Sequence, residues 1–120
     1  MAHWAMQASS ALLARVSGAL LVAPADVERL DCPAALQGFA PIPQRRLPFP
    51  SAVVGSSNDP AATAQRALLC AEHWGSEAVI LPNVGHINVQ SGHHRWESGF
   101  EFLNQLQAHT HQCWQYSASA

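Results

Sequence analysis

The segment from Ser51 to Asn88 constrains the fold more than any other, because two β-rich runs flank a helical one. Ser51 to Ser57 is a short apolar run that ends in small residues. Ala61 to Trp74 carries apolar residues at helical spacing, and Gly75 follows as a typical helix end. Glu77 to Leu81 is the second β-rich run. This order predicts a βαβ unit, whose two strands are parallel.

Each predicted strand of this unit is followed by a loop that carries a side chain suited to catalysis. Asp59 follows the first strand, and His86 follows the second. The loops that leave the carboxyl ends of parallel strands lie along one edge of the sheet, where ligands usually bind. An acid that orients a histidine supplies two members of a hydrolytic triad. The spacing therefore predicts that Asp59 and His86 lie at the same edge of the sheet, where they could act as such a pair.

Both residues also have simpler interpretations, which the sequence leaves open. Aspartate is a favoured helix N-cap and proline a favoured first helical residue, so Asp59 and Pro60 are also typical of a helix start. His86 could be a loop histidine bonded only to backbone. Asn88 and Ser91 are equally suited to capping that loop and to binding a ligand.

The remainder of the chain adds further elements to this unit. Ala2 to Arg15 has helical spacing, and Gly18 to Ala23 lacks polar alternation, as in a strand covered on both faces. Pro24 to Pro50 is a long proline-rich connection, which is often a functional rim or lid. The apolar spacing predicts a closing helix over Trp96 to Ala108, and residues 109–120 are expected to form a polar tail.

These elements predict one α/β domain over residues 1–108, followed by the tail at 109–120. The expected sheet has three parallel strands in chain order, with helices on both faces. A complete doubly wound domain normally has more strands than this. The pattern therefore corresponds to the back half of a larger sheet.

Composition excludes several classes of function. Hydrophobic residues make up 48% of the chain and charged residues 12%, with a net charge of −2, so no basic surface for nucleic acid is expected. The longest apolar run, Gly18 to Pro24, is far shorter than the roughly 20 residues that cross a bilayer. Three widely spaced cysteines form no disulfide framework and indicate a reducing, cytoplasmic location: Cys32, Cys70 and Cys113.

Neither a metal nor another cofactor is expected, although histidine is abundant. His109, His111 and Cys113 would share one face of an extended segment, but structural zinc sites usually need four fixed ligands. Cys70 lies among apolar residues of the predicted helix, which favours a buried, inert thiol over a nucleophile.

The order of several short motifs resembles a known family. The matching stretches lie between residues 2 and 106, and they are Ala19–Pro24, Asp26–Glu28, Gly38–Pro43, Leu47–Pro50, Ser57–Pro60, Gly85–Asn88 and Ser91–Gly92. Together they resemble the carboxyl-terminal portion of the retinoblastoma-binding-protein-9-like, or YdeN-like, serine hydrolases of the α/β-hydrolase superfamily. The resemblance implies that Asp59 is the triad acid, that His86 is the general base, and that the substrate is a small ester or amide.

One part of the family pattern is absent. The nucleophile of these hydrolases lies in a Gly-x-Ser-x-Gly turn, and this sequence contains none. In the family, the segment similar to Ala2–Ala5 follows that turn directly. We therefore expect the chain to begin just beyond the catalytic serine, through an internal start codon, a truncated gene or a deliberate truncation, and to be inactive by itself. The alternatives are a non-catalytic interaction module or a non-functional remnant.

The resemblance also has a consequence for assembly. In the complete fold, the strand at Ala19–Ala23 would pair with the strand that precedes the nucleophile. Without that neighbour its edge is apolar and uncharged, which favours pairing with another chain. A homo-oligomer through Ala19–Ala23 is therefore expected.

Overall fold

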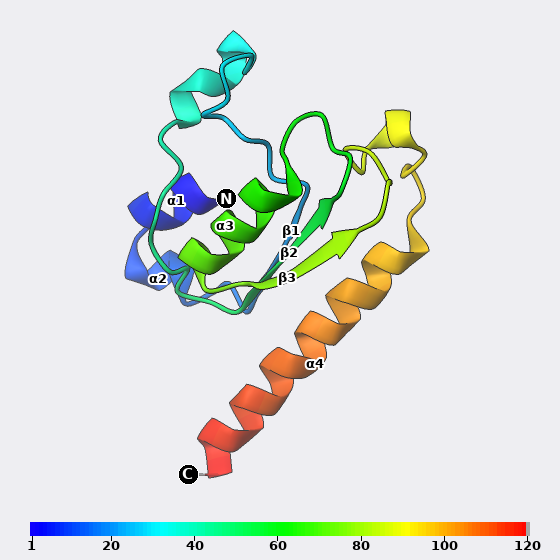
Figure 1. Ribbon diagram of the computed structural model, residues 1–120. Coiled ribbons are helices and arrows are strands. Elements are labelled where there is room, and N and C mark those ends of the chain that lie inside the picture. Colours follow the sequence, from blue (N-terminus) through cyan, green and yellow to red (C-terminus); the bar gives the residue numbers. More distant parts are fainter. Residues whose placement is uncertain (120) are drawn as a thin grey trace.

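The computed structural model describes the backbone of residues 1–119 and the side chains of residues 1–108 (Figure 1). A helix or a strand forms in each region where the sequence predicts one. In chain order the elements are α1 (Ala2–Gln7), α2 (Ser10–Leu13), β1 (Ala19–Val22), the 3-10 helix η1 (Ala34–Phe39), β2 (Ser51–Ser56), α3 (Ala64–Trp74), β3 (Glu77–Leu81), the 3-10 helix η2 (Val89–Ser91) and α4 (Glu97–Ser119).

The strands form one parallel sheet in the order β1-β2-β3. In the register, Ala19 is opposite Ser51, and Ala52 is opposite Glu77. All three strands therefore point the same way, and the loops after β2 and β3 leave the sheet at the same edge (Figure 1). The predicted α/β class, with three parallel strands in chain order, is confirmed.

Helices cover both faces of the sheet, as predicted. On one face α1 and α3 pack against β2, where Val53 is fully buried together with Ala67 and Trp74. On the other face Val54 is fully buried, and Phe102 of α4 packs against the same cluster. Figure 1 shows α3 and α4 on opposite sides of the strands. The central strand is thus apolar on both faces, as its sequence indicates.

Two helix boundaries differ from the sequence-based expectation because hydroxyl side chains cap new helices. The single helix expected over Ala2–Arg15 is interrupted, since Ser9 has an extended backbone and its side chain accepts the N–H of Leu12. Thr63 likewise caps α3 by accepting the N–H of Arg66. The helix therefore starts after Thr63, and the interpretation of Asp59 as its N-cap is wrong.

The long connection between β1 and β2 forms a hydrogen bond and ion pairs with the segment that follows β2. The backbone N–H of Asp26 donates to the carbonyl of Ala61 at 2.9 Å. Arg66 of α3 forms ion pairs with Asp26 at 3.3 Å and with Glu28 at 2.6 Å. Part of this connection consequently lies beside the candidate catalytic residues, in the position of a rim.

The last helix is longer than predicted. It was expected to end at Ala108, but α4 continues to Ser119, through most of the residues assigned to the polar tail. The side chains after Ala108 lie outside the described residues. No helix in the described part of the chain is both long and apolar enough to cross a membrane.

Candidate active site

Asp59 lies in the acid loop, residues 57–63, which joins β2 to α3. Its side chain is only 2% exposed. Oδ1 accepts the backbone N–H of Ala61 at 2.7 Å, so a local turn fixes the carboxylate. A buried carboxylate requires partners for its charge, and Ala61 supplies one of them.

His86 supplies the second partner from the histidine loop, residues 82–88, which follows β3. Nδ1 of His86 lies 2.8 Å from Oδ2 and 3.0 Å from Oδ1 of Asp59. The His86 side chain is 32% exposed. Its Nδ1 edge therefore faces a buried acid, and the opposite Nε2 edge is available to a substrate. The structure brings the two predicted residues into contact, so His86 is not bonded to backbone alone; their catalytic role stays a prediction.

A network of small polar side chains holds the two loops together. Ser56, the last residue of β2, is 1% exposed and donates from Oγ to Asn58 Oδ1 at 2.9 Å. Asn58 Oδ1 also accepts the N–H of Gly85 at 2.7 Å, and Ser56 Oγ accepts the N–H of Val84 at 3.1 Å. The residues adjacent to Asp59 are therefore bonded directly to those adjacent to His86.

A second set of contacts repeats this connection nearer the surface. The N–H of Asn83 donates to Ser57 Oγ at 2.8 Å, and the N–H of Ser57 donates to the carbonyl of Leu81 at 2.9 Å. Sequence reasoning did not identify Ser56, Ser57 or Asn58 as supporting residues. The available signal was the run of small polar residues at a strand end, immediately before the acid.

The backbone after His86 is held in an unusual conformation. Ile87 has a φ of 54°, in the left-handed region that β-branched residues rarely adopt, and its side chain is buried. The next turn is a capping box, in which Asn88 Oδ1 accepts the N–H of Ser91 and Ser91 Oγ accepts the N–H of Asn88. Asn88 and Ser91 thus cap the loop, and this turn keeps Ile87 in the core and His86 at the surface.

His86 opens into a hollow of about 480 Å³. Its lining comes from the acid loop, the histidine loop and the long connection: Arg29, Asp31, Pro60, Ala61, Gly85, His86, Asn88, Gln90 and Ser91. The expectation that part of the long connection forms a rim agrees with this lining.

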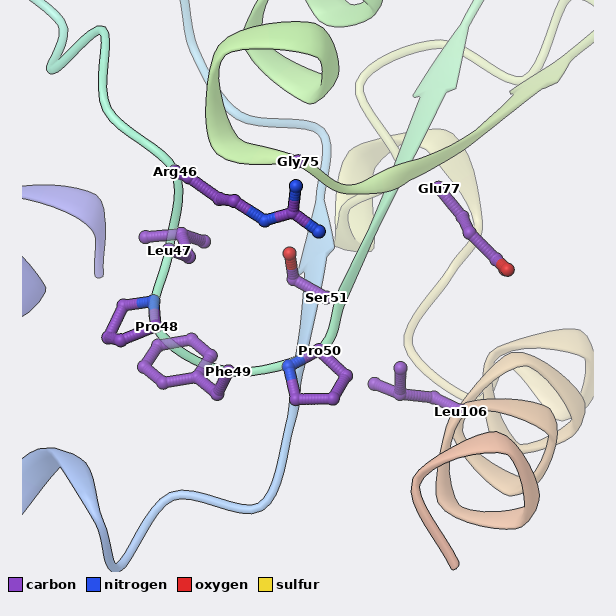
Figure 2. A pocket seen from close by; sticks show the side chains of 9 residues that line it. All are labelled: Arg46, Leu47, Pro48, Phe49, Pro50, Ser51, Gly75, Glu77 and Leu106. Carbon is purple, nitrogen blue, oxygen red and sulfur yellow. The ribbon is translucent and has the colours of Figure 1, made fainter. Parts of the chain in front are cut away.

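Another hollow, of about 550 Å³, lies at the opposite edge of the sheet (Figure 2). Ser51 and Glu77, the first residues of β2 and β3, line it together with Arg46 and Leu106. The hydroxyl of Ser51 lies 2.5 Å from that of Ser76, which does not line the hollow. No acid–histidine pair lines this hollow within the part of the chain whose side chains are described, so the His86 hollow is the candidate active site.

The remaining sequence-based candidates do not contribute to this site. Cys70 is buried in α3, and burial raises the pKa of its thiol, although the nearby Arg66 opposes this. The burial expected for this thiol is confirmed, and a raised pKa makes it a weak nucleophile. No group of three or more possible metal ligands occurs among the described residues. The side chains of His109, His111 and Cys113 lie outside the described part.

The three parallel strands with helices on both faces give the chain an α/β fold. A family model described as "Serine hydrolase" matches residues 1–105, and the chain belongs to this family. It is similar to the solved structure of a protein described as a YdeN-like hydrolase, from Pectobacterium atrosepticum, with 29% identity and a TM-score of 0.72. That match covers 91% of this chain and 54% of the other, so the chain spans about half the length of that protein. The resemblance to YdeN-like serine hydrolases is confirmed. No curated protein matches the chain.

Proposed function

We propose that the Asp59–His86 pair is the acid and general base of a serine hydrolase that acts on small esters or amides. The contact of His86 Nδ1 with the buried Asp59 carboxylate, at 2.8 Å, carries this proposal. The carboxylate holds the ring so that Nε2 faces the hollow, and it stabilises the imidazolium that forms when Nε2 accepts a proton. No metal or other cofactor is needed for this step.

The nucleophile in this proposal is a serine that the sequence does not contain in the family's Gly-x-Ser-x-Gly form. Nε2 of His86 would remove the proton of that hydroxyl and later return it to the leaving group. Loss of the triad serine alone costs on the order of 10⁶ in turnover. Loss of one oxyanion donor costs roughly 10² to 10³ more. We therefore propose that this chain by itself does not hydrolyse esters.

A fluorophosphonate probe, which modifies activated serines, tests the proposal. The 120-residue chain should remain unlabelled. A longer chain that begins upstream of Met1 and includes a Gly-x-Ser-x-Gly segment should be labelled, and His86→Ala in that longer chain should abolish the labelling. Labelling that persists after His86→Ala would show that His86 is not the base.

The unpaired edge of β1 favours a second candidate function, a module that binds another copy of itself. Among the described residues β1 pairs only with β2, so one side of its backbone has no strand partner. Val22 at the end of this strand is 37% exposed. An exposed apolar edge of this kind is a template for strand pairing.

The buried free cysteines Cys32 and Cys70 suit a reducing compartment, and we propose a cytoplasmic location.

A further inference from the structure

Arg29 lies at the rim of the hollow that contains His86. The sequence suggests a solvated side chain in a long loop, yet its side chain is only 22% exposed. Nη1 of Arg29 donates to the carbonyl of Pro60 at 3.1 Å. Since Pro60 directly follows Asp59, this bond anchors the guanidinium beside the acid of the catalytic pair.

The partner of Arg29 on the side away from Pro60 is a weakly held carboxylate. Oδ1 of Asp31 lies 3.2 Å from Nε of Arg29, and the Asp31 side chain is 85% exposed. Nε has little exposed surface, and no hydrogen bond of good geometry to it occurs among the described residues. An ion pair with so exposed an acid contributes little to stability, because solvent competes for both groups. A ligand carboxylate can therefore replace Asp31.

The other charges nearby do not neutralise Arg29. Asp59 is covered and bonded to His86. Arg66 is occupied by Asp26 and Glu28. The remaining side chains of the rim, apart from His86, are uncharged: Pro60, Ala61, Asn88, Gln90 and Ser91. Among the residues whose side chains are described, Arg29 is thus the only permanently charged cation that lines this hollow.

We propose that Arg29 binds a carboxylate of the substrate, so that the site acts on esters or amides that carry an anionic group near the scissile bond. The position of Asp31 supports a carboxylate, because it shows that such a group fits against Nε in this geometry. A guanidinium with a fixed plane binds a carboxylate through two parallel N–H donors, which also orients the substrate. This inference rests on the proposed hydrolase function and specifies its substrate class.

Binding to the chain as it exists tests the inference without requiring turnover. Butyrate and its neutral isostere butyramide are titrated at constant ionic strength, and the Arg29 Nε–H signal and the amide signals of Gly85 and His86 are followed by NMR. We expect saturable shifts with butyrate and at least about tenfold weaker binding of butyramide. Equal binding of the two, or no shift with butyrate, would overturn the inference.

Two variants and a control make the result specific. Arg29→Gln should reduce butyrate binding about tenfold or more, and Asp31→Asn should strengthen it by removing the competing carboxylate. Arg95→Gln is the matched control, because Arg95 is 83% exposed, pairs with Glu97 and does not line the hollow. Butyrate binding that survives Arg29→Gln would contradict the proposal.

The butyrate titration and the fluorophosphonate labelling can fail independently of each other. Failure of fluorophosphonate labelling in the longer chain, with butyrate binding retained, would remove the hydrolase and leave an anion-binding rim. Labelling with no preference for butyrate would keep the hydrolase and remove the anionic substrate class.

Discussion

Asn58 joins the acid loop to the histidine loop through Gly85, whose N–H donates to Asn58 Oδ1 at 2.7 Å. The same oxygen accepts the hydroxyl of Ser56. One amide side chain therefore contributes to joining two loops that are 27 residues apart at Asp59 and His86. We expect this contact to help hold the acid against the imidazole.

Asn58→Ala should lower the free energy of unfolding by about 1–3 kcal/mol, because it leaves the Gly85 N–H and the buried Ser56 hydroxyl without their acceptor. Denaturant unfolding measures the loss, and hydrogen exchange should show faster exchange at Gly85. Asn104→Ala, at an exposed position on α4, serves as the control and should have little effect. Equal stability of the two variants would show that Asn58 does not hold the loops.

Gly85→Ala should destabilise the fold by about 1–3 kcal/mol, since Gly85 has a φ of 70° and an added Cβ would lie 3.0 Å from the Ser91 Cβ. Gly38→Ala is a matched control, because an added Cβ there meets nothing within 4 Å. That control should change stability by no more than about 0.5 kcal/mol. Thermal unfolding of both variants measures the difference. An unchanged free energy of unfolding in Gly85→Ala would refute the strain argument.

Asp59→Asn should change the tautomer of His86. The carboxylate accepts a hydrogen bond from Nδ1–H in the native pair, so in the neutral imidazole the Nδ1–H form should predominate. An amide can present its NH₂ group instead, which allows the Nε2–H form. Long-range proton–nitrogen NMR spectra report the tautomer directly. Asp31→Asn should leave it unchanged, and an unchanged tautomer in Asp59→Asn would contradict the assigned pairing.

The free energy of unfolding should fall as the pH rises above 9.0, the ordinary pKa of a thiol, because burial raises the pKa of Cys70. At a pH between the two pKa values, the folded state retains the thiol proton and the unfolded state has lost it. The contribution of Cys70 to the free energy of unfolding is therefore fully present below the pKa of the unfolded state. It is lost as pH rises toward the folded pKa, by at most about 1.4 kcal/mol per pH unit. Urea unfolding measured across alkaline pH should show this slope in the native chain.

The slope should be smaller in Cys70→Ala and retained in Cys32→Ala, which changes a second cysteine that is buried in the described part of the chain. Identical slopes in all three proteins would show that Cys70 does not contribute.

The β1 edge should mediate self-association. Val22→Lys places a charge at the apolar end of this strand, which opposes pairing with another chain. Light scattering at micromolar concentration should show oligomers for the native chain and a smaller mass for Val22→Lys. Val89→Lys makes the same change at a 72% exposed position in η2 and should still associate. A monodisperse native monomer would contradict the prediction.

Local patterns in the sequence were sufficient to predict most of the fold. The apolar run of β2 and the left-handed glycine at Gly75 are short-range signals, and both were identified correctly. The break at Ser9 and the start of α3 after Thr63 were missed, because a hydroxyl can cap a helix or lie inside one and only the backbone geometry distinguishes the two. The contact of Asp59 with His86 could be expected from parallel topology alone.

The supporting residues of the site could not be predicted in the same way. The contacts of Ser56 with Val84 and of Arg29 with Pro60 join segments about 30 residues apart in the chain. Serine and arginine are frequent in solvated loops, so their identity gives no indication of such a partner. Only the three-dimensional register of neighbouring strands brings them together.

The βαβ arrangement places the acid, the base and the polar contacts between their loops within one continuous stretch of sequence. The contacts that join the two loops are therefore supplied from within that stretch. A separately supplied polypeptide that presented a serine beside Nε2 of His86 would encounter a proton acceptor that is already aligned. Reconstitution of hydrolysis from two non-covalently associated pieces is thus compatible with this architecture.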